Sequence, residues 1–449
     1  MSEQRRTENK KAKENQRGTL AVYLHIPFCL QKCLYCDFYS LPLGELGAEL
    51  VTGFRTAVIQ ELQTYLNFFQ SIRGERPRLV SLYFGGGTPT CLPAELLVGL
   101  IERVLKGFGV KASGDEVGLE VTVEANPGTL DLKKLQALKE VGVNRLSIGA
   151  QTFDPGLLRR IGRRHTAVEV VEAVNLARQA GFQNLNLDLI YGLPGQTLEN
   201  WRTTVEKALA LRPEHLAAYS LKVEPGTPFY ELQQRGKLAL PGEEVEADMF
   251  EWLSERLPAA GYQHYEISNF ARPGYTSIHN QVYWHNQEYL GLGPAAHSCL
   301  RGIQPAEVWG QTAGSNFINE ASHQLTTKLA SGAPPGVKHE TAPLFRFSNQ
   351  ANLQQYLQRV SQGQSPVDYL EAIGQQLERA ETVFLGLRLL EGISRSEFAE
   401  RFGVTVEEAY PGVIKKLKQR GLLQDEGERL ALTARAILIA NEVFLEFLP

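Results

Sequence analysis

Cysteine is scarce in this sequence, long apolar runs are missing, and neither sign of charge dominates. Five cysteines in 449 residues are too few and too unevenly placed for a disulfide framework. No stretch approaches the ~20 apolar residues that a membrane-spanning helix needs. The net charge of -4 provides no general attraction to nucleic acids or anionic membranes. We therefore expect a cytoplasmic protein, with no nucleic acid among its partners.

The length points to more than one domain, because one hydrophobic core rarely grows to 449 residues. Residues 1–18 are polar and of mixed charge, which predicts a disordered leader. Residues 19–260 alternate short apolar runs with helical patterns, and 261–366 is predicted to be an irregular connecting region rich in Gly, Pro and Asn. Residues 367–449 are helical again and are predicted to form a separate C-terminal domain.

Six strand–helix units in series predict an α/β fold with a parallel sheet, because each parallel connection needs a crossover. Apolar spacing of three and four residues predicts helices at 48–69, 93–108, 130–141, 167–180 and 198–210. Periodicity leaves a partial barrel and an open doubly wound sheet equally possible. The strand candidates are 20–25, 79–84, 118–124, 145–148, 184–190 and 215–221.

The C-terminal segment outlines a winged-helix-like module, with helices predicted at 378–390, 394–402 and 406–420 and a hairpin at 422–432. Its third helix is rich in lysine, so a DNA-binding regulator is one interpretation. The first two helices are acid-rich, which favours a structural or protein-contact role instead.

Three of the five cysteines lie within eight residues, as Cys29, Cys33 and Cys36. Thiolates select zinc, copper(I) or iron–sulfur centres, and a structural zinc site would need a fourth nearby ligand. A [4Fe-4S] cluster held by three cysteines would leave one iron open to another molecule. The CxxxCxxC spacing therefore predicts a [4Fe-4S] cluster with an open coordination site.

Polar residues follow several of the strand candidates, at the edge where β/α barrels place their sites. The run Gly85-Gly86-Gly87-Thr88-Pro89 follows the second strand, where exposed N–H groups could receive a carboxylate. Four other polar residues are candidate ligand contacts, although each could instead form an ordinary salt bridge or helix cap. They are Glu124, Gln151, Arg163 and Asp188, and a charge such as Asp188 inside an apolar strand is costly unless paired or liganded.

The cysteine spacing on the first strand of a β/α series resembles the radical S-adenosylmethionine superfamily. That resemblance implies a partial (β/α)6 barrel, with S-adenosylmethionine chelated to the open iron. Over almost the whole chain, the motifs resemble the oxygen-independent coproporphyrinogen III oxidase group. Matching the motifs residue by residue implies that the cofactor contacts are Tyr23, Tyr35, Gly86, Gly87, Thr88, Glu124, Gln151, Arg163 and Asp188.

Two features depart from the oxidases of that group. Phe38 stands where those oxidases carry a further cysteine, and the segment before the first strand is short. The run from His279 to Trp284 fits HNxxYW, which resembles the heme-binding signature of the heme chaperones in the same group. Imidazole is a good axial ligand for heme iron, and aromatic side chains pack against the macrocycle. The predicted heme contacts are His279, Asn280, Tyr283 and Trp284, with His25, His285 and His297 as alternative iron ligands.

The sequence thus predicts a heme-binding radical S-adenosylmethionine protein that carries heme to an acceptor protein. Membrane-bound respiratory proteins would be reasonable recipients, and the resemblance implies a homodimer. The alternative is an enzyme that decarboxylates coproporphyrinogen III. A DNA-binding regulator that senses redox state or heme is a third and more distant hypothesis.

Overall fold

One 12-stranded sheet organises most of the chain in the computed structural model, which describes residues 18–111, 118–310 and 342–449. The strand order is β14-β13-β12-β11-β1-β4-β5-β6-β7-β8-β10-β9. Residues 1–17 of the predicted leader lie outside the described residues. The six central strands are β1 (Thr19–Ile26), β4 (Arg78–Gly86), β5 (Glu120–Ala125), β6 (Arg145–Gln151), β7 (Leu185–Tyr191) and β8 (His215–Ser220).

These six strands confirm the six predicted from the sequence, and all are parallel to their neighbours in the series. Their spatial order follows the sequence without reversal, whereas a doubly wound sheet reverses at a switch point. This strand order indicates a curved, barrel-like sheet and excludes the doubly wound alternative. Its connecting helices are α2 (Ala48–Arg73), α3 (Ala94–Gly107), α4 (Leu132–Glu140), α5 (Pro155–Arg160), α6 (Ala167–Gln179) and α7 (Leu198–Ala210).

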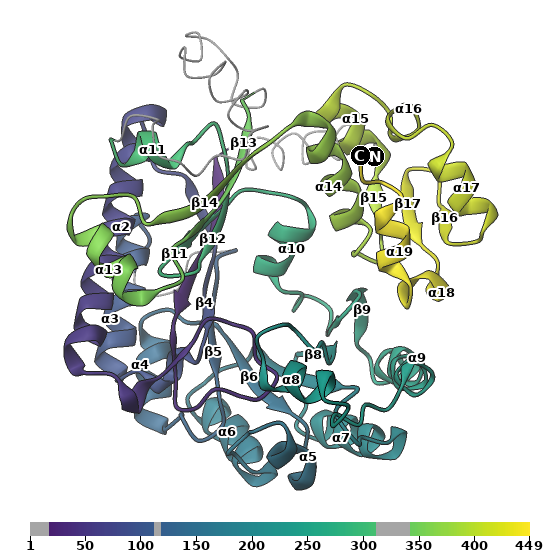
Figure 1. Ribbon diagram of the computed structural model, residues 1–449, viewed down its shortest axis with the longest axis horizontal. Coiled ribbons are helices and arrows are strands. Elements are labelled where there is room, and N and C mark those ends of the chain that lie inside the picture. Colours follow the sequence, from purple (N-terminus) through teal and green to yellow (C-terminus); the bar gives the residue numbers. More distant parts are fainter. Residues whose placement is uncertain (1–17, 112–117, 311–341) are drawn as a thin grey trace.

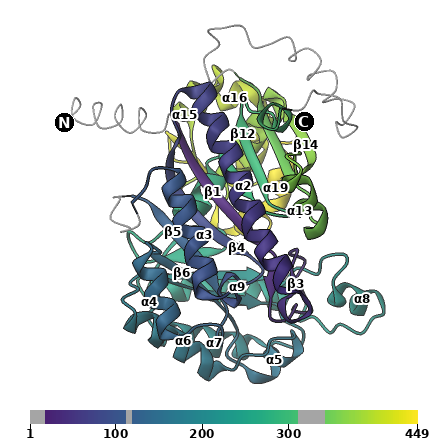
Figure 2. The same cartoon turned by 90° about the vertical axis from the view of Figure 1, so that its left-hand side faces the viewer.

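The helices cover the outer face of the curved sheet, and α2 and α3 cross in front of β1, β4 and β5 in Figure 2. Every residue of β6 is buried, as expected of a strand inside a parallel sheet. The outer-face core includes Phe54, Tyr65 and Trp201, each fully buried. Helix starts are fixed locally: Thr166 and Glu169 form a capping box at the start of α6.

The region 261–366 supplies strands that the sequence did not predict. They are β9 (Gln263–Glu266), β10 (Asn269–Ala271), β11 (Tyr289–Leu292), β12 (His297–Arg301) and β13 (Leu344–Asn349), followed by β14 (Val367–Ile373). Strand β11 pairs parallel to β1, and β12, β13 and β14 continue the sheet antiparallel. Helix α13 (Leu353–Ser361) packs beside α2, and the short helix α10 (Ile278–Trp284) lies within the curve of the sheet (Figure 1).

Five further elements belong to this part of the chain. The short strands β2 (Phe28–Cys29) and β3 (Leu41–Pro42) pair with each other beside the main sheet. Helices α8 (Pro228–Gln234) and α9 (Glu243–Ala259) follow β8, and α11 (Pro305–Val308) follows β12. No helix in the described part of the chain is both long and apolar enough to cross a membrane.

The C-terminal segment packs around a hydrophobic core of its own. Its three-stranded antiparallel sheet has the order β15-β17-β16. The helix predicted at 406–420 is wrong as a single element, because Gly412 adopts a left-handed conformation with φ 88° and divides it into α16 and α17. The elements are α14 (Gln375–Gly386), β15 (Ile393–Ser394), α15 (Arg395–Phe402), α16 (Val406–Ala409), α17 (Val413–Gln419), β16 (Leu423–Asp425), β17 (Arg429–Leu432), α18 (Ala434–Ile437) and α19 (Ala440–Leu445).

Candidate cofactor site

The loop that carries the three cysteines is closed at its base by a two-stranded pairing. Strand β2 ends at Cys29, and β3 pairs with it in parallel. The loop is fixed further along, where the Leu34 N–H donates to the Ile161 carbonyl at 3.1 Å. The sequence between these two anchors is thereby held at the carboxyl end of β1, where a β/α barrel presents its site.

The three thiols lie close enough together to influence one another. Burial raises the pKa of Cys36 to about 11, and the neighbouring Cys33 and Cys29 thiols add to the increase. Burial also raises the pKa of Cys33, which the positive charge of Arg163 opposes. Three soft donors of this kind suit an iron–sulfur cluster, provided that the metal supplies the charge that keeps them deprotonated.

Within residues 18–111, 118–310 and 342–449, no group of three His, Cys, Asp or Glu side chains converges closely enough to hold one ion. A cluster that binds one thiolate per iron spreads its ligands more widely than a single ion does. Cluster ligation by Cys29, Cys33 and Cys36 stays a prediction from their spacing in the sequence.

A chain of hydrogen bonds runs beside the cysteine loop. Thr88 lies 3.5 Å from the Cys29 Sγ and accepts from the Asn126 amide at 2.7 Å. Arg163 donates to the Asn126 side-chain oxygen at 2.5 Å and to the Tyr35 hydroxyl at 3.2 Å. The sequence did not single out Asn126, whose only signal was its position directly after β5. The network brings four separate loops to one place and leaves the Arg163 Nε without a partner.

The glycine run at the end of β4 allows close packing, and the N–H groups that follow the strand are not free. Gly87 N–H donates to the Ile26 carbonyl at 2.8 Å, and Thr88 N–H donates to the Phe28 carbonyl at 2.7 Å. A Cβ on Gly87 would lie 2.4 Å from the Phe28 oxygen, and one on Gly86 would lie 2.5 Å from the His25 ring. The N–H groups of Gly87 and Thr88 are therefore engaged within the protein, and cofactor contacts at Gly86, Gly87 and Thr88 stay a prediction.

Two partly buried carboxylates, Glu124 on β5 and Asp188 on β7, face the inside of the barrel with β6 between their strands. Burial raises the pKa of Glu124 to about 7, although the Tyr83 hydroxyl donates to it at 2.7 Å. Burial also raises the pKa of Asp188, which accepts hydrogen bonds from Ser147 at 3.1 Å and Asn186 at 2.7 Å. Neither carboxylate pairs directly with a cation among the described residues, so each has capacity for a positively charged ligand.

The space inside the barrel is reached by solvent. Tyr219 on β8 is 41% exposed, and burial together with the nearby charges of Asp188 and Glu124 raises its pKa, which indicates that it lies near both carboxylates. Gln151, buried at the end of β6, adopts a left-handed conformation with φ 64°. Such a conformation is costly for a non-glycine residue and is typical of functional sites. Tyr23 stacks on Tyr83 in the same interior, with ring centres 6.1 Å apart.

The HNxxYW residues lie on α10 but do not share one face. His279 is buried, with Nδ1 2.9 Å from the Ser81 hydroxyl and Nε2 2.9 Å from the Tyr283 hydroxyl. Burial lowers the pKa of His279 to about 3. Trp284 points elsewhere, with the Arg388 guanidinium 4.3 Å from its ring centre, and Asn280 is partly exposed. Iron ligation by His279 stays a prediction, and it would require breaking one of these two hydrogen bonds.

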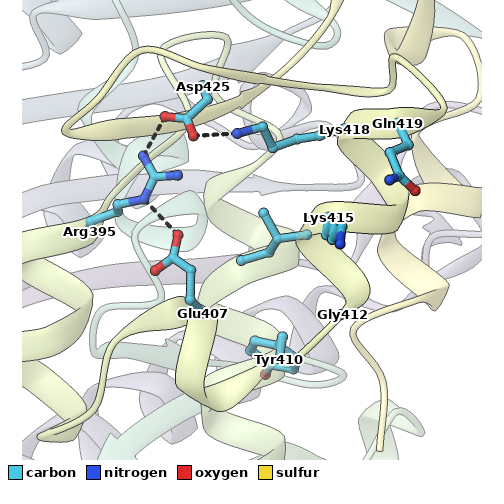
Figure 3. Close-up of a pocket in the computed structure, with 9 residues that line it drawn as sticks. Arg395, Glu407, Tyr410, Gly412, Lys415, Lys418, Gln419 and Asp425 are labelled. Carbon is cyan, nitrogen blue, oxygen red and sulfur yellow. Dashed lines mark hydrogen bonds and ion pairs between the residues drawn. The ribbon is translucent and has the colours of Figure 1, made fainter.

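A hollow of about 620 Å³ lies in the C-terminal segment, lined by residues between Arg395 and Asp425 (Figure 3). Four of its charged side chains are paired with one another: Arg395 binds Glu407 and Asp425, each at 2.9 Å, and Lys418 binds Asp425 at 2.6 Å. On the same helix, Lys416 pairs with Glu446 at 2.7 Å. These ion pairs reduce the positive charge that α17 could offer to phosphate groups.

Comparison with known proteins assigns the chain to a family. The radical SAM superfamily profile matches residues 23–208, and the HemN C-terminal domain profile matches residues 376–439. Heme chaperone HemW of Bacillus subtilis is 37% identical over 95% of this chain and 99% of the relative. Heme chaperone HemW of Lactococcus lactis is 35% identical over 95% of this chain and 97% of the relative.

The fold also resembles a solved structure. Coproporphyrinogen III oxidase HemN of Escherichia coli superposes with a TM-score of 0.72 over 96% of this chain and 90% of that one, at 22% identity. That likeness concerns the fold alone. The two full-length relatives and both profiles show that this chain belongs to the heme chaperone HemW family of the radical SAM superfamily.

Proposed function

We propose that this chain carries heme to an acceptor protein and holds a [4Fe-4S] cluster with S-adenosylmethionine on the open iron. The proposal rests on one observation above all. Three mutually close thiols, Cys29, Cys33 and Cys36, lie at the carboxyl end of a barrel whose relatives over the full length are described as heme chaperones. No fourth cysteine stands in the loop, so one iron would remain open.

The residues around the cysteines divide into two roles. Tyr35, Thr88 and Arg163 hold the loop through Asn126, and the close packing of Gly86 and Gly87 brings β4 against it. The second group faces the barrel interior, where we assign contacts with S-adenosylmethionine to Tyr23, Glu124, Gln151 and Asp188. When bound, cluster and cofactor supply one-electron chemistry, and the protein supplies orientation and exclusion of water.

Glu124 is suited to the cofactor's ammonium group. Burial favours the protonated form of Glu124 and raises its pKa to about 7. Part of the Glu124 population is therefore uncharged at neutral pH. An ammonium within hydrogen-bond distance would favour the carboxylate and lower that pKa. Cofactor binding would therefore release a proton from Glu124, and affinity would increase as the pH rises from 6 toward 8.

We extend the proposal to the cargo, the acceptor protein and the oligomeric state of the chain. The relatives described as heme chaperones support heme as cargo, and the acceptor would be a heme protein, with membrane-bound respiratory proteins as candidates. A chaperone must release its cargo, so we expect moderate heme affinity. Homodimer formation is a further proposal, which sedimentation of the cluster-loaded chain would test.

One anaerobic experiment separates carrying heme from making its precursor. The reconstituted chain is incubated with dithionite, S-adenosylmethionine and coproporphyrinogen III, and heme is titrated in parallel. We expect saturable heme binding, heme transfer to an apo-cytochrome and no multiple-turnover decarboxylation. Sustained formation of protoporphyrinogen IX would overturn the proposal in favour of the oxidase.

A further inference from the structure

Asp188 stands above a row of polar side chains on the inner face of the barrel. The strand registers align Asp188 with Gly149 of β6 and Ala217 of β8, so small residues flank it on both sides. Successive side chains of a strand alternate between faces, so the row two residues earlier lies on the same face as Asp188. That row holds three aligned polar side chains, Ser147, Asn186 and His215.

The hydrogen bonds of this row have a fixed direction, because an ionised carboxylate can only accept. The Asn186 amide nitrogen donates to Ser147 and to Asp188, each at 2.7 Å. Both amide hydrogens are thereby used, so the Asn186 oxygen accepts from the His215 Nδ1, which lies 2.6 Å away. The His215 Nε2 then accepts from the Tyr265 hydroxyl at 2.8 Å.

His215 is suited to keep this direction. It is fully buried, and burial together with the nearby charge of Arg145 lowers its pKa well below the ordinary value. The imidazole is therefore neutral and carries one hydrogen, so its two nitrogens have opposite roles. Because the Tyr265 hydroxyl donates to Nε2, the hydrogen of the ring stays on Nδ1 and is directed at Asn186.

The far end of these hydrogen bonds is anchored at the start of α10. The Tyr265 oxygen accepts from the Ser277 N–H at 3.3 Å, and the Ser277 hydroxyl donates to Glu120 at 3.4 Å. Glu120 also accepts from the His279 N–H at 3.0 Å. An unbroken series of hydrogen bonds therefore runs from the first turn of α10 to the carboxylate of Asp188.

On the basis of the proposed binding of S-adenosylmethionine, we infer that His215 is a positioning residue for Asp188. Through the Asn186 amide, His215 holds the carboxylate in one orientation toward the barrel interior before the cofactor arrives. Such preorganisation increases affinity, because the ligand does not have to order the carboxylate when it binds. His215 itself has no contact with the cofactor in this role.

Two substitutions separate positioning from mere filling of space. His215→Phe fills the site but removes both nitrogens, so the Asn186 oxygen loses its donor. His215→Asn leaves a smaller side chain, whose amide nitrogen is separated from Cβ by the same number of bonds as Nδ1 and can still donate to Asn186. A positioning role therefore predicts the greater loss of affinity in the variant that fills the site better.

The test measures the dissociation constant of S-adenosylmethionine for the anaerobically purified, cluster-loaded full-length chain by equilibrium dialysis. We expect His215→Phe to raise the constant about tenfold and His215→Asn to stay within about threefold of the unmodified chain. Tyr262→Phe is the matched control, because its buried hydroxyl donates to the Pro213 carbonyl at 2.5 Å, outside the series. It should leave the constant unchanged. Equal constants in both His215 variants, raised or not, would overturn the positioning role.

A double substitution tests whether His215 acts through Asp188. Asp188→Asn removes the carboxylate, so adding His215→Phe to it should weaken cofactor binding no further. Additive losses would overturn the route through Asp188. Circular dichroism establishes that each variant is folded.

Tyr265→Phe provides a second variant of nearly the same shape, for use even if His215→Phe does not fold. It frees Nε2 and lets the imidazole hydrogen leave Nδ1, so the dissociation constant should rise about threefold. An unchanged constant would overturn the role of the series while leaving cofactor binding intact. Failure of the unmodified chain to bind S-adenosylmethionine would instead overturn the proposed cofactor binding, and the role of His215 with it.

Discussion

Glu61 offers a stability test that depends on the turn leading to His297. This carboxylate on α2 is fully buried and accepts hydrogen bonds from Gly293 N–H at 2.9 Å, the Asn349 amide at 2.6 Å and the Tyr356 hydroxyl at 2.7 Å. Despite these donors, burial raises the pKa of Glu61 from 4.5 to about 7. The folded chain therefore binds the Glu61 proton more tightly than the unfolded chain does.

The direction in which pH changes the free energy of unfolding follows from the difference in proton binding between the folded and the unfolded chain. Between pH 4.5 and 7 the folded chain retains a proton that the unfolded chain has lost, so the free energy of unfolding decreases as the pH rises. The difference between the two pKa values corresponds to about 3 kcal/mol, present below pH 4.5 and lost by about pH 7. Glu61→Gln removes this titration and keeps the shape of the side chain.

The assay is urea unfolding of the chain and its Glu61→Gln variant at pH 5, 6, 7 and 8, followed by circular dichroism. We expect the midpoint of the unmodified chain to fall relative to that of the variant between pH 5 and 7, and the difference to stay constant above pH 7. A difference that does not change with pH would refute the reasoning, because it would show that Glu61 is ionised throughout.

Three further substitutions test the cysteine loop and α10. Gly87→Ala would place a Cβ 2.4 Å from the Phe28 oxygen and should abolish iron incorporation, whereas Gly99→Ala, which meets only a flexible arginine end at 3.7 Å, should retain it. Arg163→Lys keeps the charge but cannot donate to both of its present partners, so bound iron should decrease in a chelation assay; unchanged iron would remove the network's role. Glu120→Ala removes the acceptor of two α10 N–H groups, both at 3.0 Å. The loss should lower the free energy of unfolding by about 3 kcal/mol. An unchanged midpoint of urea unfolding would contradict this prediction.

Local patterns in the sequence predicted the six parallel strands and the longer helices between them, because each is encoded within a short window; the short helix α5 was not predicted. The strands β9 to β13 escaped prediction, since each has three to six residues and its stability comes from neighbours far along the chain. Strand β11, for example, pairs with β1 from the opposite end of the domain. Only the assembled sheet shows that this partner exists.

The same distinction applies to the candidate site. Spacing identified Cys29, Cys33 and Cys36 because ligands on one loop are close by construction. Asn126 was missed because its importance depends on Arg163, which comes from another loop. The motif containing His279 indicated the residue types but not their directions, and only the structure shows that both ring nitrogens are engaged.

The central claim is that three thiolates hold an iron–sulfur cluster with one iron open to S-adenosylmethionine. The most direct test is electron paramagnetic resonance of the anaerobically reduced chain, with and without S-adenosylmethionine, together with iron and sulfide analysis. We predict about four iron atoms per chain, a cluster signal that changes on adding the cofactor, and loss of both in the Cys29, Cys33 and Cys36→Ser variants but not in Cys91→Ser or Cys299→Ser. A cluster signal that ignores the cofactor, or a serine variant at one of the three positions that retains its iron, would contradict the account.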